Sequence, residues 1–379
     1  MKVLIAGAGV GGLALARGLV DAGHQVSVLE RSAGLREGGA AVTIFSNGAA
    51  AMAALGAPLE GIGGVIDELR FGTDQGRPMA TIDLRLMARR TGYGVSTVSR
   101  RQLIELLARD LPEELVRFGR AVQDVVTLPD GVELTDSQGE LHRVDLLVGA
   151  DGVTSRVRQL IDDQPAEPTG WATWQGLEPL PIEVAEGTYG LCQVGAAGFC
   201  GLMPAGEGRV QWWFDTPWAA EDTPLDPVSW LRERFQDYAD PVPKVLAAIT
   251  EAGLYPHVLH RVPDVWGLDR TTLVGDAAHA FPPTLAQGAN QTLEDAWLLT
   301  RVLTDPGNLT EALRGYEHRR AKKIRPVSRL AGTELTNRLP HPLVRRLAGL
   351  VPGAVTSRAY LANVKRWSTI LGDERLRRR

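Results

Sequence analysis

The sequence predicts an α/β protein in which a βαβ-type domain is interrupted by an inserted antiparallel-sheet domain and followed by a helical C-terminal region. Three observations predict this arrangement. The amino terminus reads as strand, glycine-rich loop, helix and strand. The stretch from about 165 to 265 loses that rhythm and is rich in aromatic and β-branched residues, whereas helical patterns dominate from 271 onward.

The first unit of the fold is predicted from the spacing of its apolar residues. Residues 3–6 form a short apolar run typical of a buried strand, and residues 11–22 place apolar side chains at helical spacing. Residues 24–29 read as a second strand, and the glycine-rich stretch at 7–12 joins the first strand to the helix. A parallel βαβ unit therefore opens the chain.

The stretch GAGVGG satisfies the pattern G-x-G-x-x-G through Gly7, Gly9 and Gly12, in the strand-to-helix context that the pattern requires. The first glycine permits a tight turn, the second lets a pyrophosphate approach the backbone, and the third lets helix and strand pack closely. Glu30 ends the second strand, where a carboxylate would bind ribose hydroxyls and repel a 2′-phosphate. With the adjacent Arg31, it completes a predicted dinucleotide site for NAD or FAD.

The remaining elements before the insertion are short. Residues 47–55 form a predicted helix with Asn47 as its N-cap, and a hairpin turns at 74–76. A helix follows at 100–110, and residues 121–149 give strands joined by tight turns.

The inserted region reads as successive antiparallel strands within 187–217, followed by helices near 226–239 and 241–252. The predicted domains are a discontinuous dinucleotide-binding domain (1–70, 95–165 and 266–330), a substrate-binding sheet domain (71–94 and 166–265) and a C-terminal helical segment (331–379).

The composition is that of an ordinary soluble globular protein of 379 residues, with 44% hydrophobic and 23% charged residues. A net charge of -4 gives no global attraction to nucleic acid or anionic membranes, and no apolar run reaches the roughly 20 residues of a membrane span. Two cysteines are too few for a disulfide framework or a cysteine metal site. We therefore expect a cytoplasmic monomer or homodimer with neither a metal nor a nucleic-acid or membrane partner.

Two further strand ends carry an acid beside a glycine. Asp151 follows a predicted strand within LLVGADGVTSRVR at 146–158, and Asp276 follows another within TTLVGDAAHAFPP at 271–283. Taken alone, the first motif is more typical of a plain turn and helix cap than of a ligand site. Together with the glycine fingerprint, in this order, the motifs resemble those of the group A flavoprotein monooxygenases, of the para-hydroxybenzoate and salicylate hydroxylase type.

The resemblance implies that the dinucleotide is FAD. It makes Glu30 similar to the acid that binds the adenosine ribose, and Arg100 similar to an arginine near the FAD. Asp151 belongs to a motif implicated in FAD and nicotinamide binding, and Asp276 resembles the residue whose carboxylate holds the ribityl chain.

The following segment is implied to lie beside the flavin ring. Pro282 and Pro283 match the prolines at the site of the oxygen reaction, and the chain offers no acid–base pair for that role. Gly288, Ala289 and Asn290 begin a helix whose positive end would face the pyrimidine edge and stabilise the anionic reduced ring.

The activity implied by the resemblance is monooxygenation with FAD as cofactor, NADPH or NADH as transient reductant and O2 as cosubstrate. In that family a flavin C4a-hydroperoxide passes its terminal oxygen to the substrate, here an aromatic or polycyclic small molecule that is hydroxylated or epoxidised. Two alternatives stay open: a flavin-dependent reductase or dehydrogenase on the same scaffold, and a flavoprotein without turnover that binds a hydrophobic metabolite.

The sheet domain is expected to cover the substrate. Gln175, Met203 and Trp213 are candidates for the substrate cavity, and Gln175 stands where many members of the family have an arginine. His279 is interpreted as structural rather than catalytic, because histidine is frequent at this place in the family's Gly-Asp motif. The basic stretch at 317–325 is predicted to be a solvated helix face.

Overall fold

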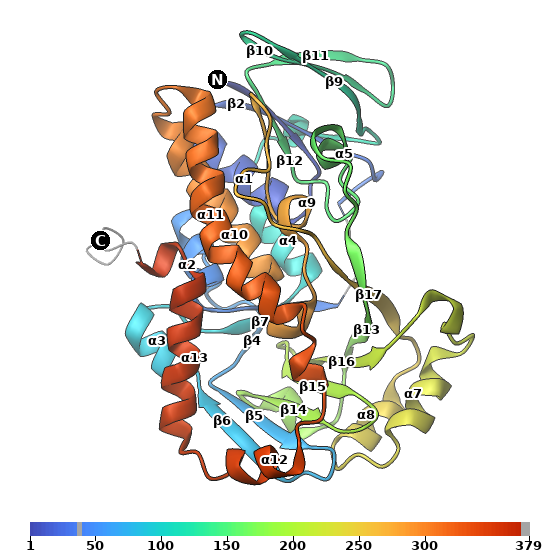
Figure 1. The fold of residues 1–379 in the computed structure, drawn as a ribbon. Helices are drawn as coiled ribbons and strands as arrows, with labels where there is room; N and C mark the ends of the chain where they lie inside the picture. Colours follow the sequence, from blue (N-terminus) through green and yellow to red (C-terminus); the bar gives the residue numbers. More distant parts are fainter. Residues whose placement is uncertain (36–39, 373–379) are drawn as a thin grey trace.

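The computed structural model describes residues 1–35 and 40–372 (Figure 1). Residues 36–39 and the end of the predicted C-terminal segment, 373–379, lie outside the described residues. Within the described residues, no helix is both long and apolar enough to cross a bilayer.

The half of the molecule that contains the glycine fingerprint is organised around a parallel sheet with the strand order β18-β12-β1-β2-β8. The strands are β1 (Lys2–Ala6), β2 (Gln25–Glu30), β8 (Val116–Phe118), β12 (Leu146–Gly149) and β18 (Thr271–Leu273). All three acid-bearing motifs follow strands of this sheet. Since the strands are parallel, motifs far apart in the sequence meet at one edge, where ligands of such sheets bind.

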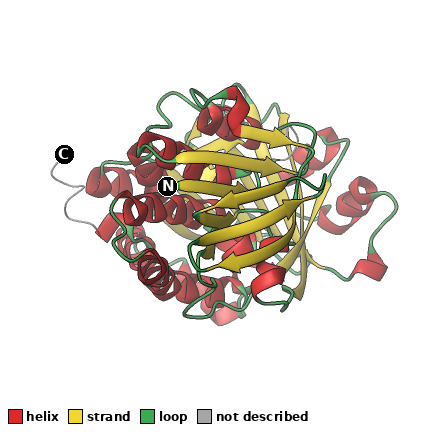
Figure 2. Cartoon of the chain, turned by 90° about the horizontal axis from the view of Figure 1, so that it is seen from above, coloured by secondary structure: helices red, strands yellow, loops and turns green. Residues whose placement is uncertain are grey.

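Helices cover this sheet and supply much of its core. They are α1 (Val10–Asp21), α2 (Ser46–Ala54), α4 (Arg100–Ala108), α5 (Arg156–Ile161), α9 (Asp276–His279), α10 (Gly288–Thr304) and α11 (Leu309–Ala331). α10 packs against both α1 and α2, so the carboxyl-terminal part of the chain closes over its amino-terminal part. Figure 2, seen from above, shows most of the helices gathered on one side of the strands.

The other half of the molecule contains a large sheet with the order β17-β13-β16-β15-β14-β5-β6. The strands are β5 (Glu68–Thr73), β6 (Pro78–Asp83), β13 (Glu167–Pro179), β14 (Tyr189–Val194), β15 (Phe199–Pro204), β16 (Arg209–Pro217) and β17 (Gly253–Leu259). The predicted hairpin and the antiparallel strands of 187–217 are confirmed. One pairing is not antiparallel: β14 runs parallel to β5. After the edge strand β6 the chain leaves the sheet, and it returns on the other side of β5.

The large sheet has two buried faces. Trp174, Trp212 and Phe214 point into a separate core beneath α7 (Pro227–Phe235) and α8 (Val242–Ala248). Trp213, between two of them on β16, points to the opposite face because side chains alternate along a strand. That alternation gives the sheet one face packed on this core and one face turned toward the half that contains the parallel sheet.

Smaller elements complete the described chain. Two small sheets are formed by β3 (Ala41–Ile44), β7 (Ser96–Ser99) and β4 (Gly64–Val65), and by β9 (Val122–Leu128), β10 (Gly131–Asp136) and β11 (Leu141–Val144). The other helical elements are α3 (Arg85–Thr91), η1 (Glu113–Leu115), α6 (Glu183–Glu186), η2 (Ala220–Asp222), η3 (Pro283–Leu285), η4 (Leu335–Asn337), α12 (Pro342–Ala348), α13 (Gly353–Trp367) and η5 (Ile370–Gly372).

Two local predictions were wrong. Asn47 is not the N-cap of α2; Phe45 is, without a side-chain cap. The Asn47 amide is buried and donates to Gln287 Oε1 at 3.2 Å and to Glu294 Oε1 at 2.9 Å. The stretch at 317–325 is not simply solvated, because Glu317 and Arg320 are completely buried. In both places the prediction assumed a side chain in contact with water or with its own helix, whereas the side chain is buried and bonded to polar groups of distant segments.

Candidate active site

A cavity of about 470 Å³ lies where the carboxyl ends of the parallel strands face β13, β16 and β17 of the large sheet. Its size and its position between two domains are typical of a ligand site. Most of the residues predicted from the sequence line it: Gly7, Gly9, Glu30, Arg31, Arg100, Asp151, Gln175, Trp213, Asp276, Pro283, Gly288 and Ala289. Gly12, Pro282, Asn290 and Met203 do not.

Two glycines of the loop serve different purposes, one in packing and one in leaving space for a ligand. A Cβ on Gly12 would lie 1.9 Å from the Gly7 carbonyl oxygen, so this glycine is needed for helix–strand packing. A Cβ on Gly9 would meet no protein atom within 4 Å. Gly9 is also the N-cap of α1, and neither a capping side chain nor an acid occupies the first turn of that helix. The open space and the free N–H groups fit a bound pyrophosphate.

Glu30 lies at the end of β2 and is almost completely buried. Its carboxylate accepts hydrogen bonds from the backbone N–H of Ala8 at 2.8 Å and of Ser32 at 2.9 Å. It therefore ties the glycine loop to the end of β2. Each carboxylate oxygen can accept a second bond, which leaves room for ribose hydroxyls.

Asp151 caps the turn before α5 as well as lining the cavity. Its carboxylate accepts from the Ser155 hydroxyl and, at 2.7 Å, from the backbone N–H of Arg156. From α5, the buried guanidinium of Arg158 reaches across to α9 and donates to the carbonyl oxygens of Ala277 at 3.3 Å and Ala278 at 2.9 Å. The second motif therefore helps to hold the third in place.

Asp276 begins α9 beside the cavity, directly after Gly275, whose φ of 62° favours glycine. Burial raises the pKa of Asp276 above its usual value, although His279 and Arg100 act in the opposite direction. Asp276 in turn raises the pKa of Tyr255, a cavity residue on β17 that the sequence analysis missed. A carboxylate held here, close to an arginine and a tyrosine, can bind hydroxyl groups of a ligand.

His279 lies behind Asp276, away from the cavity. Its Nε2 lies 2.6 Å from Asp295 Oδ2, and the same oxygen accepts the backbone N–H of Gly275 at 2.8 Å. The ring also stacks on Phe281 and meets Trp266 edge-on. These contacts agree with the structural role expected for His279, because they determine the path of the backbone that carries Asp276.

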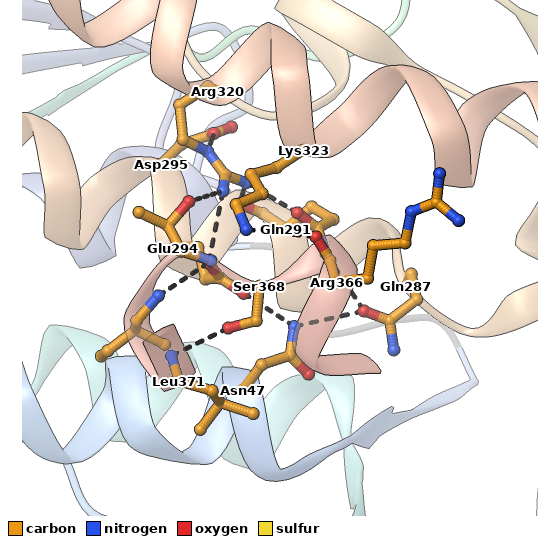
Figure 3. A network of polar contacts seen from close by, with 12 residues as sticks. Asn47, Gln287, Gln291, Glu294, Asp295, Arg320, Lys323, Arg366, Ser368 and Leu371 are labelled. Carbon is orange, nitrogen blue, oxygen red and sulfur yellow. Dashed lines mark hydrogen bonds and ion pairs between the residues drawn. The ribbon is translucent and has the colours of Figure 1, made fainter. Parts of the chain in front are cut away.

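A buried polar network supports this loop from the back, and Figure 3 shows its centre. Arg320 of α11 donates to Asp295 Oδ1 at 2.6 Å, to Glu294 Oε2 at 3.3 Å and to the side-chain oxygen of Gln291 at 2.8 Å. It also donates to the Thr369 hydroxyl at 2.9 Å, near the end of the described chain. Burial raises the pKa of Asp295, but His279 and Arg320 outweigh it and hold the pKa below its usual value.

The start of α10 faces the cavity through Gly288 and Ala289, and no acid lies in its first turn. Its positive end is therefore open to a ligand. Asn290 is turned away: its amide donates to Thr43 O at 3.0 Å and accepts from Phe45 N at 2.8 Å. The predicted contact of Asn290 with a cofactor is thus replaced by a role in joining α10 to the amino-terminal segment.

The wall of the cavity on the large sheet consists of Thr173, Gln175, Gln211, Trp213 and Tyr255. None of these side chains is a carboxylate, a guanidinium or an ammonium group. Gln175 and Trp213 are directly paired across β13 and β16. The Gln211 amide donates to Ala41 O at 2.7 Å, whereas its Oε1 is buried without a partner among the described residues. Strand alternation from Trp213 could have identified Gln211 in the sequence.

Met203 is the substrate candidate that the structure places elsewhere. It pairs with Gln211, so it lies on the cavity side of the sheet, but on β15, one strand farther out. Its sulfur packs closely over Gly190 of β14, where even a Cβ would lie 2.1 Å away. The sequence pattern gave the correct face but not the distance from the cavity.

Behind Thr173 lies a chain of buried ionisable groups that the sequence analysis missed. The Thr173 hydroxyl donates to Asp215 and lies 2.7 Å from His257 Nε2, and His257 Nδ1 lies 2.9 Å from Glu334 Oε1. Burial raises the pKa of Asp215 to about 6, although His257 and Thr173 lower it. The members come from β13, β16, β17 and the turn before η4, and no sequence motif connects them.

One group in the described residues has the geometry of metal ligands: Asp136, Glu140 and His142, whose ligand atoms lie within 4.8 Å of one another. Arg120 already pairs with Asp136 at 2.6 Å and with Glu140. The arginine compensates these carboxylates, so the cluster is explained as an ion-pair network.

Comparison with known proteins agrees with the geometry of the cavity. The family model described as "FAD binding domain" matches residues 1–331. The chain is 31% identical over 335 residues to the aurachin C monooxygenase/isomerase of Stigmatella aurantiaca, covering 85% of this chain and 86% of that protein. It is 30% identical over 335 residues to an FAD-dependent urate hydroxylase of Klebsiella pneumoniae, covering 86% and 87%.

A solved structure gives the same answer for the fold. The crystal structure of Klebsiella pneumoniae HpxO complexed with FAD and uric acid matches with a TM-score of 0.89 and 26% identity, covering 97% of both chains. The resemblance and the FAD cofactor predicted from the sequence motifs are confirmed, and NAD(P)H is the reductant typical of the family. The chain therefore belongs to the flavoprotein family of FAD-dependent aromatic-ring monooxygenases, and it is an FAD-dependent monooxygenase.

Proposed function

We propose that this enzyme hydroxylates a ring compound that carries N–H or O–H donors and no carboxylate, and that binds between the flavin and the sheet wall. The observation that carries this proposal is the buried, unpartnered Oε1 of Gln211 on a wall without charged side chains. A buried acceptor without a partner is costly, so it favours a ligand that donates to it.

Thr173 adds a second acceptor to the wall. Its proton is donated to Asp215, and His257 lies at hydrogen-bond distance from the same oxygen. The remaining lone pair of this oxygen can only accept a hydrogen bond from a substrate. A substrate carboxylate would find neither a donor at these two atoms nor a cation on this wall to pair with.

The FAD would extend through the cavity along the residues that the sequence motifs predicted for it. Glu30 and Arg31 would hold the adenosine end, Gly9 and α1 the pyrophosphate, and Asp276 the ribityl chain. When bound, FAD supplies the redox chemistry, accepting hydride from NAD(P)H and activating O2.

The other residues near the ring would position it and exclude water. Arg100 would contribute positive charge, and Asp151 would hold the loop beside the ring. Pro283 begins η3 and lines the cavity, whereas Pro282 is the N-cap of η3 and does not line it. Pro283 is therefore the proline proposed to border the oxygen site. The positive end of α10 at Gly288 and Ala289 would face the ring edge.

We also propose that the protein acts in the cytoplasm as a monomer or homodimer. Cys192 and Cys200 are buried free thiols, which suits a reducing compartment.

The test compares NADH and NADPH oxidation, O2 consumption and product formation for matched pairs of ring compounds with and without a carboxylate. Gln211→Leu should raise KM for donor-bearing substrates on the order of tenfold and leave FAD affinity unchanged. Gln193→Leu is the matched control, because Gln193 is also buried in the large sheet with an unpartnered Oε1 but does not line the cavity. Preferential turnover of the carboxylates would overturn the proposed substrate class.

A further inference from the structure

The C-terminal part of the chain carries an exposed apolar surface that the oxygenase site does not use. We name the C-terminal apolar face by its residues: Leu343, Val344, Leu347, Leu350, Val351 and Val355. Each is between 42% and 75% exposed. None of them lines the cavity. Single exposed apolar residues are ordinary, but a contiguous group indicates an interaction surface.

The face is built on α12, the turn that follows it and the first turn of α13. Leu343, Val344 and Leu347 occupy positions i, i+1 and i+4 of α12, so they share one side of the helix. No residue of α12 is buried, although the helix lies beside β6, at the bottom of Figure 1. A helix whose large apolar side chains all remain in water lacks the burial that normally stabilises it.

The segment of sequence that carries this face is basic, and Arg345 and Arg346 lie on α12 itself. The stretch 335–372 contains no aspartate or glutamate, and its basic residues are Arg338, Arg345, Arg346, Arg358, Lys365 and Arg366. On β6, the backbone N–H of Asp83 donates to the Ser357 hydroxyl of α13, whereas the Asp83 carboxylate is paired with Arg85 at 3.2 Å and Arg89 at 3.1 Å. The overall charge of -4 conceals this local excess of positive charge.

We infer that the C-terminal apolar face docks the enzyme on an anionic lipid bilayer. Apolar side chains next to arginines on a short surface helix are the chemistry of interfacial membrane binding, and each basic residue adds attraction to anionic headgroups. Docking is peripheral, since no described helix can cross a bilayer. The expectation that the protein has no membrane partner followed from the overall charge and the absence of a span, and neither detects such a face.

A second copy of the chain is the competing occupant. A two-fold interface through this face would place two copies of the same basic segment against each other, and 335–372 offers no acid to pair with Arg345 and Arg346. Phosphate headgroups supply the negative charge that this segment lacks.

The test is flotation of the FAD-loaded, full-length enzyme with vesicles of phosphatidylcholine alone or mixed with phosphatidylglycerol. We expect binding to the mixed vesicles that weakens with salt, and little binding to phosphatidylcholine alone. Leu343→Ser with Leu347→Ser, and separately Arg345→Gln with Arg346→Gln, should each lower the bound fraction on the order of tenfold. The flavin spectrum and far-UV circular dichroism should not change.

Matched controls use an equally exposed surface elsewhere. Val126→Ser with Leu141→Ser removes apolar side chains that are 56% and 62% exposed on β9 and β11, and it should leave vesicle binding intact. Absence of binding to the mixed vesicles, or an equal loss in the control, would overturn the inference. So would sedimentation showing a dimer that the Leu343 and Leu347 changes convert to monomer without any vesicle binding, which would assign the face to a second copy.

Discussion

Replacing Arg320 by methionine tests whether the buried network holds the flavin loop. Arg320 has no exposed surface and donates to Asp295, Glu294, Gln291 and the Thr369 hydroxyl. Methionine fills a similar length but leaves two buried carboxylates without their cation. Loss of one partner of a buried ion pair typically costs about 3–5 kcal/mol, and we expect a loss of that order in the free energy of unfolding of the apoprotein.

The loss should depend on pH in a defined direction. The pKa of Asp295 lies below its usual value in the folded protein, so its contribution to stability is present above the unfolded pKa of about 4 and disappears as the pH falls through the folded pKa. Without Arg320 that pKa rises. The gap between wild type and variant should therefore be largest at neutral pH and shrink in acid.

The assay is urea denaturation of the apoprotein followed by tryptophan fluorescence, together with titration of FAD. Arg319→Met is the matched control, because Arg319 neighbours Arg320 on α11 but is exposed. FAD affinity should also fall in the Arg320 variant, since Asp295 holds both His279 and the Gly275 backbone. A difference between the two variants below about 1 kcal/mol, within the range of ordinary surface changes, would refute the reasoning.

The remaining predictions concern the cofactor loop and the buried acid. Gly12→Ala should destabilise the apoprotein because its Cβ would lie 1.9 Å from a carbonyl oxygen, whereas Gly9→Ala should keep apoprotein stability and lose FAD affinity; equal stabilities in urea would contradict this. Asp276→Ala should raise the FAD dissociation constant on the order of tenfold or more with unchanged circular dichroism, and an unchanged constant would remove its proposed role. Burial raises the pKa of Asp215 to about 6 in the folded protein, above its unfolded value of about 4, so its contribution to the free energy of unfolding should be lost as the pH rises from about 4 to 6. In Asp215→Asn this loss should be absent, and an identical pH dependence of the urea midpoints in both proteins would contradict the prediction.

The sequence by itself determined the cofactor half of this protein. The turn at Gly7, the close packing at Gly12 and the acid at the end of β2 are consequences of local backbone geometry and of one βαβ unit, so a short stretch of sequence specifies them. The order of the three motifs was sufficient to predict FAD and monooxygenation, and relatives at 30% and 31% identity confirm both.

Only the tertiary structure decided the rest. Thr173 and Tyr255 come from strands far apart in the sequence, and only sheet pairing brings them to the cavity wall beside Gln211 and Trp213. Arg320 reads as one more basic residue on a helix, and its burial depends on acids contributed by α10. The charge around α12 is readable in the sequence, but its exposed apolar face is not, because burial depends on what the rest of the chain packs against. Short segments of sequence determine local backbone geometry, whereas contacts between distant segments determine which residues are buried and which partners the buried polar groups find.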